Sequence, residues 1–85
     1  MAPEISRFYG IKLTMRFPSK EHNPPHIHAA YAGYNASFSI KDGMILDGKF
    51  PQKGTKMVVE FIERNRNELM EMWKKAKYKK LPPIK

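Results

Sequence analysis

Three histidines, the only ones in the 85-residue chain, lie within a span of seven residues. Residues 22–28 read His-Asn-Pro-Pro-His-Ile-His, so two adjacent prolines stiffen the backbone between His22 and His26. An imidazole titrates near neutral pH, transfers protons and coordinates metal ions. The cluster therefore indicates a candidate site for acid–base or metal chemistry.

Metal binding is one chemistry that this spacing allows. Residues two apart in a strand point to the same face, so His26 and His28 can converge on one ligand. Neutral imidazole nitrogens suit zinc, and His22 can add a third ligand from the loop. One hypothesis is therefore a small metal-binding domain that holds a divalent cation such as zinc through these three residues. The other hypotheses require no cofactor.

Proton transfer at a phosphodiester is the second chemistry. If the strand that precedes the histidines pairs with the strand that carries His26 and His28, Lys12 and Arg16 share their face. A base, an acid and a cation that stabilises developing negative charge suit metal-free cleavage, and the same groups can bind phosphate without cleaving it. The candidate catalytic residues are His26, His28, His22, Arg16 and Lys12.

A structural role is the third interpretation of the histidines. The two prolines have no N–H group, so His22 and His26 can instead hold the loop through hydrogen bonds to backbone carbonyls. His26 and His28 begin a predicted strand and point away from its apolar face, which makes them better functional candidates than His22.

The elements that position these side chains follow from apolar spacing. Period-two alternation, as in Ile11, Leu13 and Met15, is typical of half-buried strands, and after Pro51 the spacing becomes helical. Asn65 interrupts the helical stripe. We expect strands at about 10–17, 26–32, 35–41 and 44–48, helices at about 53–64 and 67–79 (or one bent helix), and a tail at 80–85 that lies along the surface.

These elements predict a single α+β domain over residues 1–85. Its architecture is a small antiparallel β-meander of three to four strands, with one face covered by two C-terminal helices or one kinked helix. The mean hydropathy is −0.62, and no apolar run approaches the roughly 18 residues of a membrane span. The chain has no cysteine and no apolar signal segment, so we expect a cytoplasmic protein without a membrane partner.

Positive charge is the main compositional signal. Sixteen Lys and Arg residues against eight Asp and Glu residues give a net charge of +8, which favours nucleic acid or an acidic protein as partner. Lysines gather near the C-terminus, where they either complement the helix dipole or bind an anion. The candidate anion-binding residues are Arg7, Lys74, Lys75, Lys77, Lys79 and Lys80.

Several stretches resemble a known bacterial family, the domain of unknown function numbered 4160. They are residues 3–11 (PEISRFYGI), the histidine segment at 22–28, residues 31–34 (YAGY) and residues 47–51 (DGKFP), with Trp73 near the end of the helical part. The similarity covers nearly the whole chain. Such proteins are typically encoded beside a second small domain, an arrangement resembling a toxin–antitoxin pair. The resemblance implies the toxin-like half, with a small antitoxin-like protein as its partner.

Three functional hypotheses follow. The leading one is a toxin-like protein that binds or cleaves RNA through its histidine and arginine face. The second is a non-enzymatic module that binds an acidic partner protein or DNA through the lysine-rich tail. The third is the histidine-based metal-binding domain.

Overall fold

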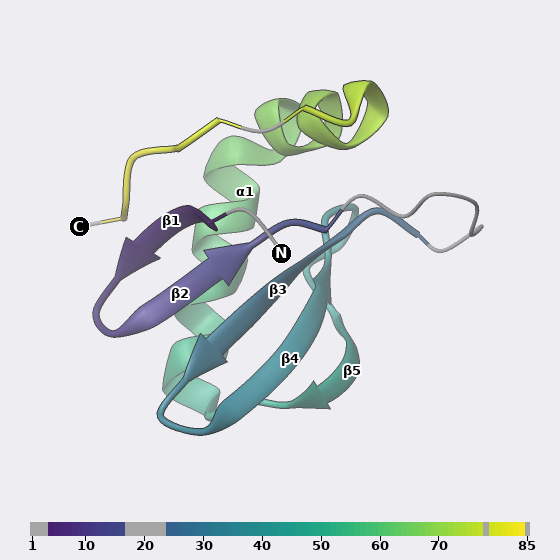
Figure 1. Ribbon diagram of the computed structural model, residues 1–85. Coiled ribbons are helices and arrows are strands. Elements are labelled where there is room, and N and C mark those ends of the chain that lie inside the picture. The colour runs from purple at the N-terminus through teal and green to yellow at the C-terminus, as the bar shows by residue number, and fades with distance from the viewer. Residues whose placement is uncertain (1–3, 17–23, 78, 85) are drawn as a thin grey trace.

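The computed structural model describes residues 4–16, 24–77 and 79–84. Within these residues, five antiparallel strands form one open sheet in chain order, and one helix covers one of its faces (Figure 1). The elements are β1 (Glu4–Phe8), β2 (Ile11–Thr14), β3 (His26–Tyr31), β4 (Tyr34–Ser39), β5 (Ile45–Lys49) and α1 (Gln52–Lys75). The α+β class and the antiparallel meander are confirmed.

The core lies between α1 and the sheet. Alternate residues of β2, β3 and β4 are buried, as period two requires, and they meet buried residues at helical spacing on α1. The completely buried members include Leu13, Ile27, Phe38, Val58 and Phe61. The intervening strand residues consequently point to the opposite face of the sheet, which α1 leaves open. We call this the outer face.

The expectation of three to four strands was wrong, because β1 is a fifth strand. A bulge between Glu4 and Ser6 interrupts the register of β1 on β2, so the consecutive residues Ile5 and Ser6 are both buried. This removes the alternation from which a strand is recognised in sequence. Tyr9 and Gly10, both at positive φ, make the two-residue turn into β2.

The expectation of two helices was also wrong, whereas the bent-helix alternative is confirmed. Asn65 has non-helical backbone angles (φ −120°, ψ 19°), and its side-chain amide donates to the Phe61 carbonyl at 3.0 Å. Helical turns continue on both sides of it. The helix ends at Lys75 rather than near residue 79, because Ala76 adopts a left-handed conformation and Lys77 N–H donates back to the Met72 carbonyl at 3.1 Å.

The C-terminal segment is part of the core instead of a surface tail. Leu81 and Ile84 are only 7% and 6% exposed, and Leu81 N–H donates to the Ile5 carbonyl at 2.7 Å. Lys79 forms an ion pair with Glu68 at 2.7 Å. The segment lies beside β1 (Figure 1). Removing the Leu81 and Ile84 side chains from water stabilises this position, although a proline-containing segment was expected on the surface. In the part of the chain that the structure describes, no helix has the length and apolar character of a membrane span.

Candidate functional site

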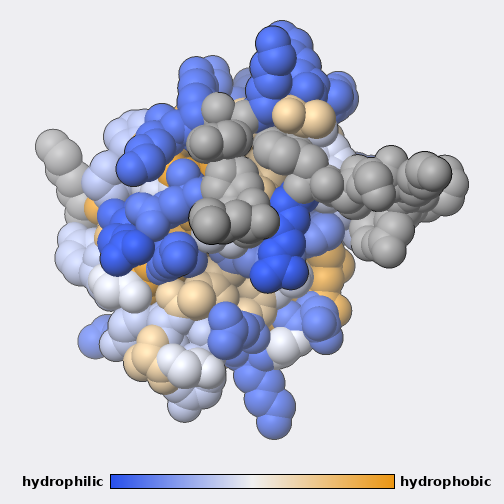
Figure 2. Space-filling model, in the orientation of Figure 1, coloured by the Kyte–Doolittle hydropathy of each residue, from blue (hydrophilic) through white to orange (hydrophobic). Residues whose placement is uncertain are grey.

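Two rows of side chains cross the outer face. Thr14 pairs with His28, His28 with Ser37, and Ser37 with Asp47, so these four residues form one row over β2, β3, β4 and β5. The next row begins with Arg7 opposite Lys12 on β1 and β2 and continues through β3 to β5. Because β2 pairs with β3, Lys12 lies on the same face of the sheet as His26 and His28. Figure 2 shows this face to be largely hydrophilic.

His28 lies near the middle of this face and is half-buried. Its Nδ1 is 3.3 Å from the Ser37 hydroxyl. Burial lowers the pKa of His28, and the positive charges of Arg16 and His26 lower it further, while Asp47 acts in the opposite direction. The neutral imidazole is therefore favoured at pH 7, as a proton acceptor requires.

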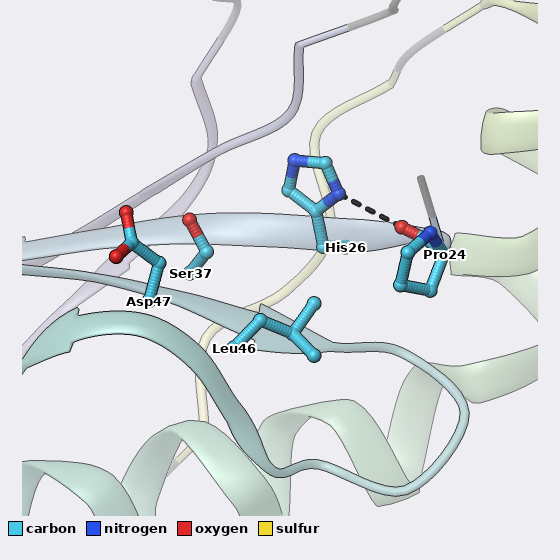
Figure 3. Close-up of a pocket in the computed structure, with 5 residues that line it drawn as sticks. All are labelled: Pro24, His26, Ser37, Leu46 and Asp47. Atoms are coloured by element: carbon cyan, nitrogen blue, oxygen red, sulfur yellow. Dashed lines mark hydrogen bonds between the residues drawn. The ribbon is translucent and has the colours of Figure 1, made fainter. Parts of the chain in front are cut away.

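His26 is anchored by its neighbours. Its Nδ1 donates to the Pro24 carbonyl at 2.9 Å, which is the hydrogen bond that the loop-holding interpretation predicts (Figure 3). A carbonyl can only accept, so Nδ1 carries the proton and Nε2 is left for other partners. The ring packs edge-on against His28 and also contacts Trp73, with centroid distances of 5.2 Å and 5.1 Å.

Among the residues that the structure describes, the outer face contains two neighbouring pockets. The first, here the cationic pocket, has a volume of about 270 Å³, and the second, here the mixed pocket, has a volume of about 320 Å³. The cationic pocket is lined by Lys12, Thr14, Arg16, His28, Ala29, Ala30 and Asn35. The mixed pocket is lined by Pro24, His26, Ser37, Leu46 and Asp47. His28 and His26 thus belong to adjacent pockets.

Four of the five candidate catalytic residues come together on this face. Lys12, Arg16 and His28 line one pocket, and His26 contacts His28 from the other. His22 lies outside the described residues. Within residues 4–16, 24–77 and 79–84 no three His, Asp or Glu side chains form a group that could hold a metal ion. The set of His22, His26 and His28 includes a residue outside these ranges, so it stays a prediction.

The candidate anion-binding residues are spread over other surfaces. Arg7 continues the outer face but forms an ion pair with Glu4 at 2.7 Å. Lys79 pairs with Glu68, and Lys75 is 3.9 Å from Glu71. The remaining exposed lysines, at the end of α1 or after it, are Lys74, Lys77 and Lys80.

Asp47 and Trp73 are among the residues of the site that did not emerge from the sequence as site residues. Both stand out there only in the stretches that resemble the family. A register shift between Ser37 and Phe38 decides which residue of β5 lies opposite Ser37, and the sequence pattern contains no signal for that shift. Trp73 packs against the core, and its ring also contacts the ring of His26.

A family model described as Domain of unknown function (DUF4160) matches residues 10–74, a range that contains every residue of both pockets. No curated protein and no solved structure matches the chain.

Proposed function

The chain belongs to the family of the Domain of unknown function (DUF4160), and from the geometry of its outer face we propose that it binds RNA there and cleaves it. This proposal rests on one observation: Lys12, Arg16 and His28 line the same pocket, and the ring of His26 contacts His28. The proposal includes the toxin-like role that the family resemblance implies, with a small antitoxin-like protein as partner.

The cationic pocket is suited to a phosphate group. Lys12 and Arg16 are exposed and supply two positive charges, while the Thr14 hydroxyl and the Asn35 amide can donate further hydrogen bonds. Phosphate contacts of this kind supply affinity but read no sequence.

The two histidines have complementary capacities for proton transfer. In the base form His28 donates Nδ1–H to Ser37 and uses Nε2 to accept the proton of the ribose 2′-hydroxyl. The 2′-oxygen then bonds to phosphorus while the bond from phosphorus to the 5′-oxygen breaks. His26, with both ring nitrogens protonated in this step, keeps Nδ1–H on the Pro24 carbonyl and gives its Nε2 proton to the departing 5′-oxygen. Arg16 stabilises the charge on the phosphoryl oxygens. The products are a 2′,3′-cyclic phosphate and a free 5′-hydroxyl.

Binding is tested first, with a fluorescent single-stranded 2′-O-methyl RNA, which cannot be cleaved, and with the variants Arg16→Ala and Lys12→Ala. Each should weaken binding and reduce its dependence on salt, because each removes a phosphate contact. Lys53→Ala is the matched control, since Lys53 is exposed on α1. Absence of RNA binding by the wild type at low salt would contradict the proposal.

Cleavage is tested separately. The wild type should release fragments ending in a 2′,3′-cyclic phosphate, and His26→Ala/His28→Ala should bind RNA but leave it intact. When expressed in bacteria, the wild type should slow growth more than the double variant. Intact RNA with both proteins would reduce the function to binding alone and overturn the catalytic part.

A further inference from the structure

The mixed pocket contains a carboxylate and apolar side chains, which do not suit a phosphate. Figure 3 shows Asp47 and Ser37 at one end of it and Pro24 at the other, with Leu46 between them and His26 above. The pocket therefore has apolar walls and one polar end. A carboxylate at that end disfavours a phosphate, so the occupant must be the uncharged part of a nucleotide.

We propose that the mixed pocket binds a guanine base of single-stranded RNA, an inference that rests on the RNA-binding function proposed above. Asp47 accepts hydrogen bonds from the Watson–Crick edge of the base, and the flat ring of His26 packs against the base. The phosphate of the same strand lies in the cationic pocket. Single-stranded RNA is commonly recognised in this way, by stacking and by hydrogen bonds to the exposed base edge.

The choice of guanine follows from donor and acceptor positions. An ionised carboxylate only accepts, and it offers two oxygens side by side. Guanine presents two adjacent donors, N1–H and the N2 amino group, which match both oxygens. Adenine and cytosine each present one amino donor next to an acceptor nitrogen, and uracil presents one N–H between two carbonyls. Those acceptors would repel the carboxylate.

The position of His26 suits a stacking wall. The Pro24 carbonyl fixes its Nδ1, and Trp73 contacts the ring, so the imidazole is held in place before a base arrives. Pre-organised rings lose little conformational entropy on binding. The pocket volume of about 320 Å³ leaves room for a purine.

The arrangement also gives the bound strand a direction. Asp47 and Thr14 are at opposite ends of one row across four strands, which is three strand spacings or about 14 Å. The negative end of the row repels phosphate and the positive end attracts it. A nucleotide therefore places its base towards β5 and its phosphate towards β2.

The test compares four labelled RNA heptamers, UUUGUUU, UUUAUUU, UUUCUUU and UUUUUUU, in fluorescence anisotropy at one salt concentration. All four carry 2′-O-methyl groups, so that the wild type cannot cleave them. The wild type should bind the guanine heptamer about 5- to 150-fold more tightly than the others, the range of one good two-bond base contact. Inosine in place of guanine lacks the N2 amino group and should give an intermediate affinity.

Variants separate this inference from the proposed function. Asp47→Asn should abolish the guanine preference and leave binding to UUUUUUU unchanged or tighter, because a negative charge is lost. Glu63→Gln, the same change at an exposed site on α1, should keep the preference, and Arg16→Ala should weaken all four heptamers equally. Equal binding of all four by the wild type, or an unchanged preference in Asp47→Asn, would overturn the guanine pocket alone. No binding at all would overturn the RNA-binding function.

Discussion

The imidazole of His26 and the indole of Trp73 are in contact, with ring centroids 5.1 Å apart and ring planes inclined by 55°. The contact joins the start of β3 to the last turns of α1, two segments separated by more than forty residues. It gives the candidate site a supporting residue on the helix as well as on the sheet.

This contact makes tryptophan fluorescence a probe of His26. Trp73 is the one tryptophan of the chain, so the emission of the protein reports on the surroundings of this indole. His26→Leu should change the intensity or the wavelength of Trp73 emission in the folded protein, because it removes the ring that the indole contacts. His28→Leu, which keeps that contact, should change the emission less; identical emission from the wild type and His26→Leu would show that the two rings do not interact.

Stability should depend on pH through His28. Its pKa is lower in the folded state than in the unfolded chain, mainly because of burial, so the unfolded chain binds more protons below about pH 6.5. The free energy of unfolding should therefore decrease as pH falls from about 6.5 towards the folded-state pKa. Above that window His28 adds no dependence of the free energy of unfolding on pH. Urea unfolding at a series of pH values measures it. His28→Gln should flatten the curve, and an equal slope in that variant would assign the dependence to other groups.

Glycine at position 76 should stabilise the protein. Ala76 has φ +52° at the end of α1, a left-handed conformation that costs a residue with a Cβ about 1 kcal/mol. Ala76→Gly should raise the free energy of unfolding by about that amount, seen as a higher Tm. The control is Ala30→Gly in β3, which should lower stability by about 0.5–1 kcal/mol because glycine weakens a strand. A loss of stability in Ala76→Gly would contradict the assigned helix end.

Shortening Leu81 should destabilise the whole fold. Its side chain is 7% exposed and packs in the core, so Leu81→Ala should cost about 2–5 kcal/mol in urea unfolding. The neighbouring Pro82 is exposed, and Pro82→Ala should change stability by less than about 0.5 kcal/mol. The milder Ile84→Val should cost about 0.5–1.5 kcal/mol and serves where Leu81→Ala does not fold. Equal stability of all three would mean that the segment lies on the surface.

Local patterns predicted the elements whose burial is regular. Alternation in β2, β3 and β4 and helical spacing in α1 identified their buried faces, and with them the outward direction of His26 and His28. The position of Lys12 on the same face as the histidines follows from the pairing of β2 with β3. Alternation fails where the backbone departs from regular geometry, as at the bulge between Glu4 and Ser6.

The remaining features depend on contacts between distant parts of the chain. Leu81 and Ile84 flank two prolines and show no period, so their burial beside β1 becomes evident only in the folded chain. Asp47 enters the site through a register shift in β5, and Trp73 through the course of α1 after Asn65. Local sequence contains neither piece of information.

The bend at Asn65 divides α1 into two parts with different exchange behaviour. The turns before it contribute Val58, Phe61 and Ile62 to the core, whereas the turns after it are held by Leu69 and Met72. Fewer buried contacts mean a smaller free energy of local opening, so amide hydrogens after Asn65 should exchange faster than those before it. Opening of this second part would release Trp73 from His26 while the sheet and the first part stay folded. The position of His26 thus depends on whether the part of α1 after Asn65 stays folded. Binding at the outer face would therefore slow the exchange of amide hydrogens in that part of the helix.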